Sequence, residues 1–301
     1  MKVLITSISA VICEDLVNIS NYKKFSRNDK LIIYSNSRNK NLKTDFNIDW
    51  TNQESIKNSG ISEIVFDVVI NTAGVAYQMN AINQNPYTFL SESNLITKNI
   101  LLNLRFNQFI QISSPSIYYV DWLKRKKFDL NKTHNLGEIK LSDDILAKTY
   151  CYEFKKNINI VRPQSILSKR EEPREINGHV FSELTFKILN KQLNFLDIKA
   201  LSTQELVFLS PKYMWIDIFK LLLKNSENIV KVIKGKEKIT IIQFVKEICS
   251  FGFLKKIIDK DVTIKFKDKE ITFSSNNVKF RKTNNYQFQL IRNYLKYHYE
   301  K

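Results

Sequence analysis

Glycine, proline and cysteine are scarce in this chain of 301 residues. It has 6 glycines, 5 prolines and 3 cysteines, and no glycine precedes Gly60. The odd number and wide spacing of the cysteines (Cys13, Cys151 and Cys249) fit a reducing compartment and exclude a metal cluster. The three histidines are also far apart and predict no zinc site. We therefore expect a cytoplasmic protein that binds no metal.

Long apolar runs are also missing. No uninterrupted apolar stretch approaches the roughly 20 residues that a membrane helix needs. The first residues enter a predicted strand directly, so we expect no signal peptide. Hydrophobic residues make up 43% of the chain, which excludes a disordered protein and predicts one or two domains with a large core.

Acidic residues are fewer than basic ones, 30 against 47, which gives a formal net charge of +17. One interpretation is an anionic partner such as nucleic acid or a phosphorylated substrate. The other is a lysine-rich composition spread over solvated faces. The longest basic run, Lys124–Lys127, has only Trp122 and Phe128 as aromatic neighbours, which favours the second interpretation. We keep a basic nucleic-acid-binding protein as the least favoured function.

The first seventeen residues predict a strand, a tight turn and a helix. Lys2–Ile5 is a short β-branched run, Thr6–Ala10 is a turn of small residues, and Val11–Val17 has helical spacing. This is the opening of a βαβ unit, in which a dinucleotide's pyrophosphate rests on a helix N-terminus.

Further hydrophobic runs alternate with helical segments. The predicted strands are 31–34, 66–71, 109–112 and 158–163, with a further one at 46–50 that precedes a capped helix. Asn94 and Ile96–Leu104 predict a long helix between two of them. This alternation predicts an α/β fold, with a doubly wound parallel sheet.

Five motifs in order resemble the extended short-chain dehydrogenases/reductases, the NAD(P)-dependent epimerase/dehydratase family. They are the opening turn, Asp49, the stretch Phe66–Gly74 (FDVVINTAG), the stretch ending in Ser113–Tyr118 (SSPSIY), and Arg162-Pro163. The resemblance covers residues 1 to about 250. It implies a Rossmann-like sheet, a smaller C-terminal α/β substrate domain, a nucleotide-sugar substrate and a homodimer.

The opening turn departs from the family's TGxxGxxG pattern, because its glycine positions hold Ser7, Ala10 and Cys13. If Ser7 needed a left-handed backbone, it would cost about 1–2 kcal/mol. Ala10 adds a methyl group near the pyrophosphate, Cys13 adds a thiol where helix and strand pack, and Glu14 and Asp15 oppose a phosphate. These changes predict weakened cofactor binding and leave open that no cofactor binds.

The resemblance implies cofactor contacts along the sheet edge. Arg38 follows the second strand where NAD-binding chains carry an acidic residue, which favours NADP over NAD, although an ordinary polar loop fits equally well. Asp49 would lie near the adenine; alternatively, Asp49 or Thr51 is a helix N-cap. The implied cofactor-binding residues are Thr6, Ser7, Ala10, Val11, Ile12, Arg38, Asp49, Trp50, Thr72, Ala73, Gly74 and Lys148.

The resemblance also implies a catalytic serine and a Tyr-x-x-x-Lys pair. Ser114 takes the serine position, and Lys148 is the candidate lysine. Four residues before it stands Asp144, which could pair with Lys148 but would be a poor proton donor near neutral pH. A second pair, Tyr152 and Lys156, lies close to Arg162, and we expect Tyr150 and Tyr152 to pack a helix face.

The domain boundaries follow from the same alignment. We expect residues 1–167 to bind NAD(P) and 168–301 to be mainly substrate-binding, with 207–233 returning to the core. Helices are predicted at 179–196, 241–250 and 286–299. The favoured function is an NAD(P)-dependent epimerase, dehydratase or reductase acting on a nucleotide-activated sugar. The alternative is a non-catalytic relative that keeps the fold as a binding or assembly partner.

Overall fold

The computed structural model describes residues 1–10, 12–14, 16, 31–39, 41–74, 79–120, 135–175, 179–223, 228–276 and 284–300. The basic run Lys124–Lys127 lies outside these residues. The chain forms two compact units. The first is Met1–Gln164 with Pro211–Ile233, and the second is Ser165–Ser210 with Lys234–Lys301.

A six-stranded parallel sheet forms the centre of the first unit. Its order is β2-β1-β3-β4-β5-β8, so the order reverses between β1 and β3. Ligands of open α/β sheets bind outside the carboxyl ends of the strands at such a reversal. The α/β, Rossmann-like prediction is confirmed. The strands are β1 (Lys2–Ile5), β2 (Ile32–Ser35), β3 (Val65–Asn71), β4 (Arg105–Ile112), β5 (Asn157–Pro163) and β8 (Val230–Ile233).

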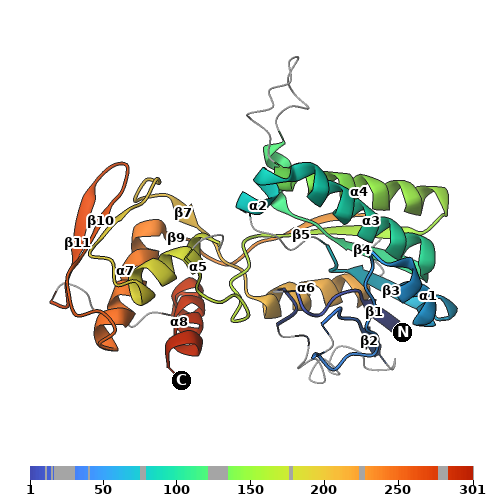
Figure 1. Cartoon of the computed structure of the whole chain (residues 1–301), viewed down its shortest axis with the longest axis horizontal. Coiled ribbons are helices and arrows are strands. Elements are labelled where there is room, and N and C mark those ends of the chain that lie inside the picture. The colour runs from blue at the N-terminus through green and yellow to red at the C-terminus, as the bar shows by residue number, and fades with distance from the viewer. Residues whose placement is uncertain are drawn as a thin grey trace, which may run out of the picture. The chain divides into compact units, whose positions relative to one another are not determined.

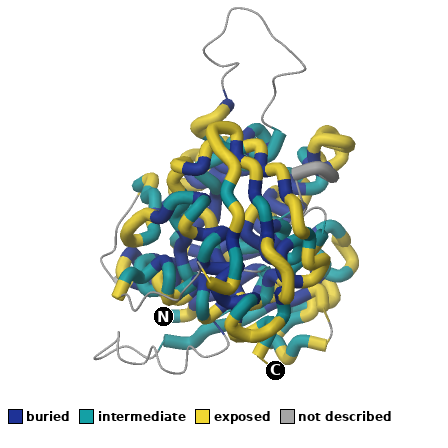
Figure 2. Tube along the Cα trace, turned by 90° about the vertical axis from the view of Figure 1, so that its left-hand side faces the viewer, coloured by how far each residue is buried: buried dark blue, intermediate teal, exposed yellow. Residues whose placement is uncertain are grey.

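Helices cover both faces of this sheet (Figure 1). The long helices α3 (Pro86–Asn103) and α4 (Asn135–Glu153) pack on one face, and α6 (Pro211–Leu223) lies on the other. Buried residues gather in the interior and exposed ones on the outside (Figure 2). The shorter elements are α1 (Gln53–Asn58), η2 (Ile61–Glu63), α2 (Met79–Gln84) and η3 (Pro115–Tyr119).

The second unit has its own apolar core between helices and two small sheets. Strands β6 (Phe195–Asp197), β10 (Val262–Lys265) and β11 (Glu270–Phe273) form one sheet, and β7 (Glu205–Leu206) pairs with β9 (Ile239–Thr240). The helices are α5 (Val180–Thr185), the π-helical turn η6 (Phe186–Asn190), α7 (Ile241–Leu254) and α8 (Tyr286–Tyr299). The predicted helices at 241–250 and 286–299 are present.

Three local predictions are wrong. Helix α3 begins at Pro86 rather than near Asn94, because proline is favoured in a helix's first turn. Residues 46–50 form no strand but a single bridge between Phe46 and Asn36. The helix predicted over 179–196 ends at Asn190, and the chain turns at Gln192, whose φ is +49°, before entering β6.

Within the described residues, no helix is both long and apolar enough to cross a bilayer.

Candidate functional site

Thr6 joins the carboxyl ends of β1 and β3 where the strand order reverses. Its hydroxyl accepts hydrogen bonds from the backbone N–H groups of Thr72 and Ala73, both at 3.0 Å, and donates to Asn71 at 2.9 Å. Asn71 donates in turn to Gln111 on β4 at 3.0 Å. Because fully paired buried polar groups specify one arrangement, this network fixes the ends of three neighbouring strands.

Side chains rather than glycines hold the turn after β1. The Thr72 hydroxyl accepts from the Ser7 N–H at 2.9 Å and donates to the Ser7 carbonyl at 2.8 Å. The buried Cys13 thiol donates to the same carbonyl at 3.2 Å, and the Ser7 and Ser9 hydroxyls lie 3.0 Å apart. The thiol therefore has a structural partner at a position where the family carries glycine.

The backbone of this turn is not strained. None of the residues Ser7–Ala10 adopts a left-handed φ. The non-glycine residues that do, in the described part of the chain, all lie elsewhere, at Lys155, Gln192, Asn228, Glu237 and Lys256. The cost considered for a left-handed Ser7 does not arise, so the missing glycine leaves an intact turn.

A cavity of about 290 Å³ opens beside the turn, and we call it the cofactor cleft. This volume lies near the lower end of ligand pockets, which span roughly 300–1,000 Å³, and suits one nucleoside-sized part of a larger ligand. Nine residues predicted to bind the cofactor line it together: Thr6, Ser7, Ala10, Arg38, Asp49, Trp50, Thr72, Ala73 and Gly74.

Trp50 forms a wall of the cofactor cleft. Its indole N–H donates to the Thr6 carbonyl at 2.8 Å, and its side chain is buried. The adjacent Asp49 faces Arg38, with 3.8 Å between Oδ2 and Nη1. The second Asp49 carboxylate oxygen accepts from the backbone and hydroxyl of Thr51.

Asn52 caps helix α1. Its side chain accepts hydrogen bonds from the N–H groups of Glu54 and Ser55. The alternative interpretation of Asp49 or Thr51 as the helix N-cap is therefore wrong.

One predicted cofactor contact at the opening turn lies elsewhere. Ile12 belongs to a short 3₁₀ turn at residues 12–14, and its carbonyl accepts a hydrogen bond from the indole of Trp215 at 2.7 Å. Ile12 is not among the residues that line the cofactor cleft. Val11 and Asp15 lie outside the described residues.

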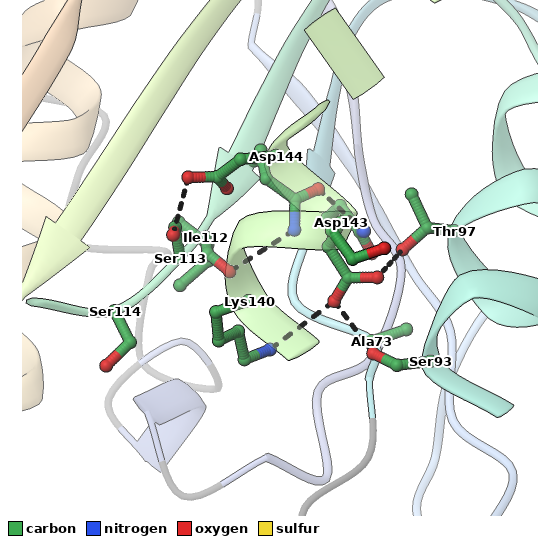
Figure 3. A network of polar contacts seen from close by, with 12 residues as sticks. Ala73, Ser93, Thr97, Ile112, Ser113, Ser114, Lys140, Asp143 and Asp144 are labelled. Carbon is green, nitrogen blue, oxygen red and sulfur yellow. Dashed lines mark hydrogen bonds and ion pairs between the residues drawn. The ribbon is translucent and has the colours of Figure 1, made fainter. Parts of the chain in front are cut away.

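Lys140 is the α4 lysine that lies next to Gly74. A Cβ atom added to Gly74 would lie 3.4 Å from Lys140 Nζ. The same Nζ is 4.0 Å from Asp143 Oδ2, and Asp143 also accepts from the hydroxyls of Ser93 at 2.7 Å and Thr97 at 3.2 Å (Figure 3). Burial raises the pKa of the Asp143 carboxyl, although Lys140 and the two hydroxyls oppose that shift.

Lys148 lies elsewhere on α4. It is exposed and stands eight residues beyond Lys140, about 12 Å further along the helix. It lines a different hollow of about 620 Å³ together with Cys151 and Tyr152. The sequence did contain a signal for Lys140. A helix that starts from Lys148 is too short before Arg162, and Lys140 lies about two helical turns further from Arg162.

Leu136 stands four residues before Lys140, at the place of the tyrosine in a Tyr-x-x-x-Lys pair. It is partly buried and packs against Ile82, Phe89 and Ile139. A leucine side chain has no proton to exchange, so this position supplies packing instead of acid–base chemistry.

Asp144 pairs with Arg162 at the end of β5 rather than with Lys148. Arg162 Nη2 donates to Asp144 Oδ2 at 3.0 Å. The Ser113 hydroxyl donates to the same oxygen at 2.9 Å (Figure 3). The Asp144 side chain is 4% exposed and that of Arg162 is 12% exposed. Burial raises the pKa of Asp144, while Arg162 and Ser113 oppose the shift. Asp144 therefore serves a buried ion pair.

Ser114 is the N-cap of η3, just beyond the carboxyl end of β4, and Tyr118 lies within η3. The Ser114 hydroxyl caps η3 by accepting from the Ser116 N–H at 3.2 Å and from the Ser116 hydroxyl at 2.9 Å. Tyr118 is 56% exposed, and its phenol oxygen accepts from Arg162 Nη1 at 3.0 Å. Sequence reasoning assigned no role to Tyr118.

The two tyrosines at the end of α4 differ. Tyr150 packs against Phe106 and Phe154, with ring centroids 6.1 and 4.5 Å apart, as predicted. Tyr152 is 87% exposed, so the packing prediction is wrong for it.

Comparison with known protein families identifies the relatives of this fold. The model of the NAD dependent epimerase/dehydratase family matches residues 15–218. The chain belongs to this family. No curated protein sequence matches it significantly.

Solved structures of the same fold cover nearly the whole chain. RMD from Pseudomonas aeruginosa, complexed with NADPH, is 16% identical, with a TM-score of 0.66 and 99% of each chain covered. UDP-glucuronic acid 4-epimerase from Bacillus cereus, in complex with NAD, is 19% identical, with a TM-score of 0.62, covering 100% of this chain and 98% of that one. A dTDP-4-dehydrorhamnose reductase from Clostridium acetobutylicum is 15% identical, with a TM-score of 0.61 and coverage of 98% and 99%. At these low sequence identities, the structural similarity shows that the fold is shared.

Proposed function

We propose that the protein binds an NAD(P) dinucleotide in the cofactor cleft and acts on a nucleotide-activated sugar. One observation carries the proposal: the nine predicted cofactor residues line one cavity, and Lys140 Nζ lies next to Gly74 at the edge of that lining. Residues from four separate segments of sequence meet there. Structures of the same fold hold NADPH or NAD, which supports the same ligand class here.

The residues present fit such a ligand. Asp49 and Trp50 would hold the adenosine end, and the unstrained turn at Ser7–Ala10 would face the pyrophosphate. Lys140 would hold the nicotinamide ribose through its ammonium, the role predicted for Lys148. A Cβ at Gly74 would be in van der Waals contact with the Lys140 ammonium, so glycine leaves the most space beside it. When bound, the dinucleotide would supply hydride chemistry.

Arg38 supports NADP over NAD. It lines the cofactor cleft, and its partner Asp49 is 3.8 Å away and partly exposed. A surface ion pair of this kind is weak, so a ribose 2′-phosphate could replace Asp49 as the partner of Arg38.

Ser114 is the proposed contact to the sugar. Its hydroxyl lies at the carboxyl end of β4. The oxygen accepts from the N–H and the hydroxyl of Ser116, which leaves the Ser114 hydroxyl proton available to an acceptor. We also propose, from the sequence, that residues 168–301 are mainly substrate-binding, apart from 207–233. Two of the structures with this fold are described with UDP-glucose and with UDP-glucuronic acid, which supports the substrate class.

Titration of the purified protein with NADPH and NADH, followed by nicotinamide fluorescence, tests the binding proposal. Wild type should bind NADPH saturably and more tightly than NADH. Lys140→Ala should weaken binding about tenfold or more, since a charge-assisted hydrogen bond contributes about 1.5–3 kcal/mol. Lys148→Ala is the matched control on the same helix and should leave affinity unchanged. Equal losses in both variants, or no binding to wild type, would contradict the proposal.

A non-catalytic relative is the second candidate, because Leu136 removes the tyrosine. It predicts saturable NADPH binding that Lys140→Ala weakens, without turnover of any nucleotide sugar. Binding and turnover measured on the same preparation separate the two candidates.

We also propose a homodimer formed through α3 and α4. Leu95 and Ile145, on the outer faces of these helices, are 41% and 55% exposed and line a shared hollow of about 460 Å³. Light scattering should give twice the chain mass for wild type and a monomer for Leu95→Glu/Ile145→Glu. A monomeric wild type would refute this proposal.

A further inference from the structure

We propose that Tyr118, held by Arg162, is the proton-transfer group of this site in place of the tyrosine that Leu136 has replaced. This inference rests on the proposed function, because it needs a substrate oxygen at the carboxyl edge of the sheet. Its basis is a chain of contacts that runs from Ser113 and the buried Asp144 through Arg162 to the exposed phenol.

The phenol is fixed at the edge where the ligand is expected. Tyr118 lies four residues after Ser114 on η3, which follows β4, and Arg162 is near the end of the adjacent strand β5. The guanidinium donates to the phenol oxygen at 3.0 Å, and its central carbon is 5.1 Å from the ring centroid. An exposed tyrosine held at both oxygen and ring keeps a defined position.

The cation that holds Tyr118 is itself fixed. Arg162 donates to Asp144 at 3.0 Å, and Asp144 is fixed in turn by the Ser113 hydroxyl. Burial lowers the pKa of Arg162, but the bonds and charges of Tyr118 and Asp144 raise it by more, so the group stays a guanidinium. Its charge remains next to the phenol oxygen throughout a proton transfer.

The chemistry is a single proton transfer. Arg162 has no acceptor atom, so the phenol oxygen can only accept from it, and the phenol O–H is free to point at a substrate oxygen. When that O–H bond breaks, a new O–H bond forms on the substrate oxygen. The phenolate lies against the guanidinium until solvent returns a proton. In the reverse direction, the phenolate takes a hydroxyl proton.

The carboxylates nearby are poorer candidates. Asp144 is buried and committed to Arg162 and Ser113, and Asp143 is buried against Ser93 and Thr97. Glu138 is two residues from Lys140 on α4 and therefore points about 200° away from it around the helix.

The first experiment needs no turnover. N-acetylimidazole acetylates accessible phenols, and mass spectrometry locates the product. UDP-glucose and UDP-glucuronic acid, added with NADPH, should protect Tyr118 and leave the adjacent Tyr119, which is 68% exposed, as reactive as before. Equal reactivity of Tyr118 with and without a nucleotide sugar whose binding has been measured would overturn the proposal.

The second experiment uses substitution and rescue. Tyr118→Phe should leave the Kd for NADPH unchanged and lower kcat on a panel of UDP-, GDP- and dTDP-hexoses by about 10²–10⁴, the usual contribution of a general acid or base. Tyr119→Phe is the control and should keep wild-type kcat. Leu136→Tyr in the Tyr118→Phe background should restore part of kcat, because it returns a phenol four residues before Lys140.

The outcomes separate this inference from the function beneath it. If the Tyr118→Phe variant turns over substrate at the wild-type rate, the role of Tyr118 is overturned and the proposed function stands. Saturable NADPH binding without turnover on the whole panel overturns it too, and supports the non-catalytic relative. Absence of NADPH binding overturns both the proposed function and this inference.

Discussion

The turn after β1 and the start of α4 both depart from the family's pattern, with different consequences. At the turn, three glycine positions carry side chains, yet Thr72 and Cys13 hydrogen-bond the Ser7 backbone and the turn remains unstrained. At α4, a leucine replaces the tyrosine, and its neighbours are apolar. The first departure changes how a backbone shape is held, whereas the second removes a chemical group.

This difference shows which kinds of substitution other residues of a fold can compensate. A backbone shape can be stabilised by any side chain that supplies a donor or acceptor in the right place. A titratable proton must come from a side chain that carries one, so Leu136 can be compensated only from another element. Substitutions in each region measure how firmly it is held.

The strongest effect is expected at the ion pair between α4 and β5. Arg162→Ala leaves the Asp144 carboxylate buried without its cation, and breaking a buried pair in this way costs about 3–5 kcal/mol. Urea denaturation at neutral pH should show that loss in the free energy of unfolding. Arg38→Ala is the matched control, because its pair with Asp49 is exposed and should change stability by less than about 1 kcal/mol. Similar losses in both variants would contradict the distinction.

A smaller effect is expected at the network that closes the turn. Thr6→Val keeps the side-chain shape but removes the oxygen that accepts from Thr72 and Ala73 and donates to Asn71. Unpaired buried groups of this kind cost about 1–3 kcal/mol. Urea denaturation measures the loss, and NADPH affinity should fall as the turn loosens. Unchanged stability and affinity would show that the turn does not depend on this network.

The sheet could be predicted from sequence because its strands contain short apolar runs, such as Val3–Ile5 and Val68–Ile70, flanked by polar turns. The cofactor cleft could be predicted in large part because its residues follow strand ends, and parallel strands bring their carboxyl ends to one edge. The strand predicted at residues 46–50 is absent, and a single bridge at Phe46 takes its place. No local sequence pattern distinguishes such a bridge from a short strand.

The reactive part of the site could not be predicted in the same way. The residues around Lys148 in the sequence indicate it as the candidate lysine. Which lysine lies beside Gly74 depends instead on where α4 starts and how the helix is rotated on the sheet. The contacts of Arg162 with Asp144 and Tyr118 join residues 18 and 44 positions apart, and only the packing of α4 and η3 around β5 brings them together.

Asp143 makes the stability of the α3–α4 contact depend on pH. Burial raises the pKa of its carboxyl above the ordinary value of about 3.8, so the folded state holds this proton more tightly than the unfolded state. Its contribution is complete below about pH 3.8 and is lost as the pH rises through the folded-state pKa. The free energy of unfolding of Asp143→Asn, minus that of wild type, should therefore rise from pH 4 upward. A flat difference for Asp143→Asn would contradict the prediction.

The smallest effect is expected at the thiol that replaces a glycine. Cys13→Ser keeps a donor for the Ser7 carbonyl, whereas Cys13→Ala removes it and leaves a small void, at a cost of about 1 kcal/mol. Thermal denaturation should rank wild type and Cys13→Ser above Cys13→Ala, with NADPH affinity following the same order. If Cys13→Ala were as stable as wild type, the thiol would only fill space, and the turn would be held by Thr72 alone. In that case one hydroxyl, rather than a set of side chains, would take over the role of the glycines in this turn.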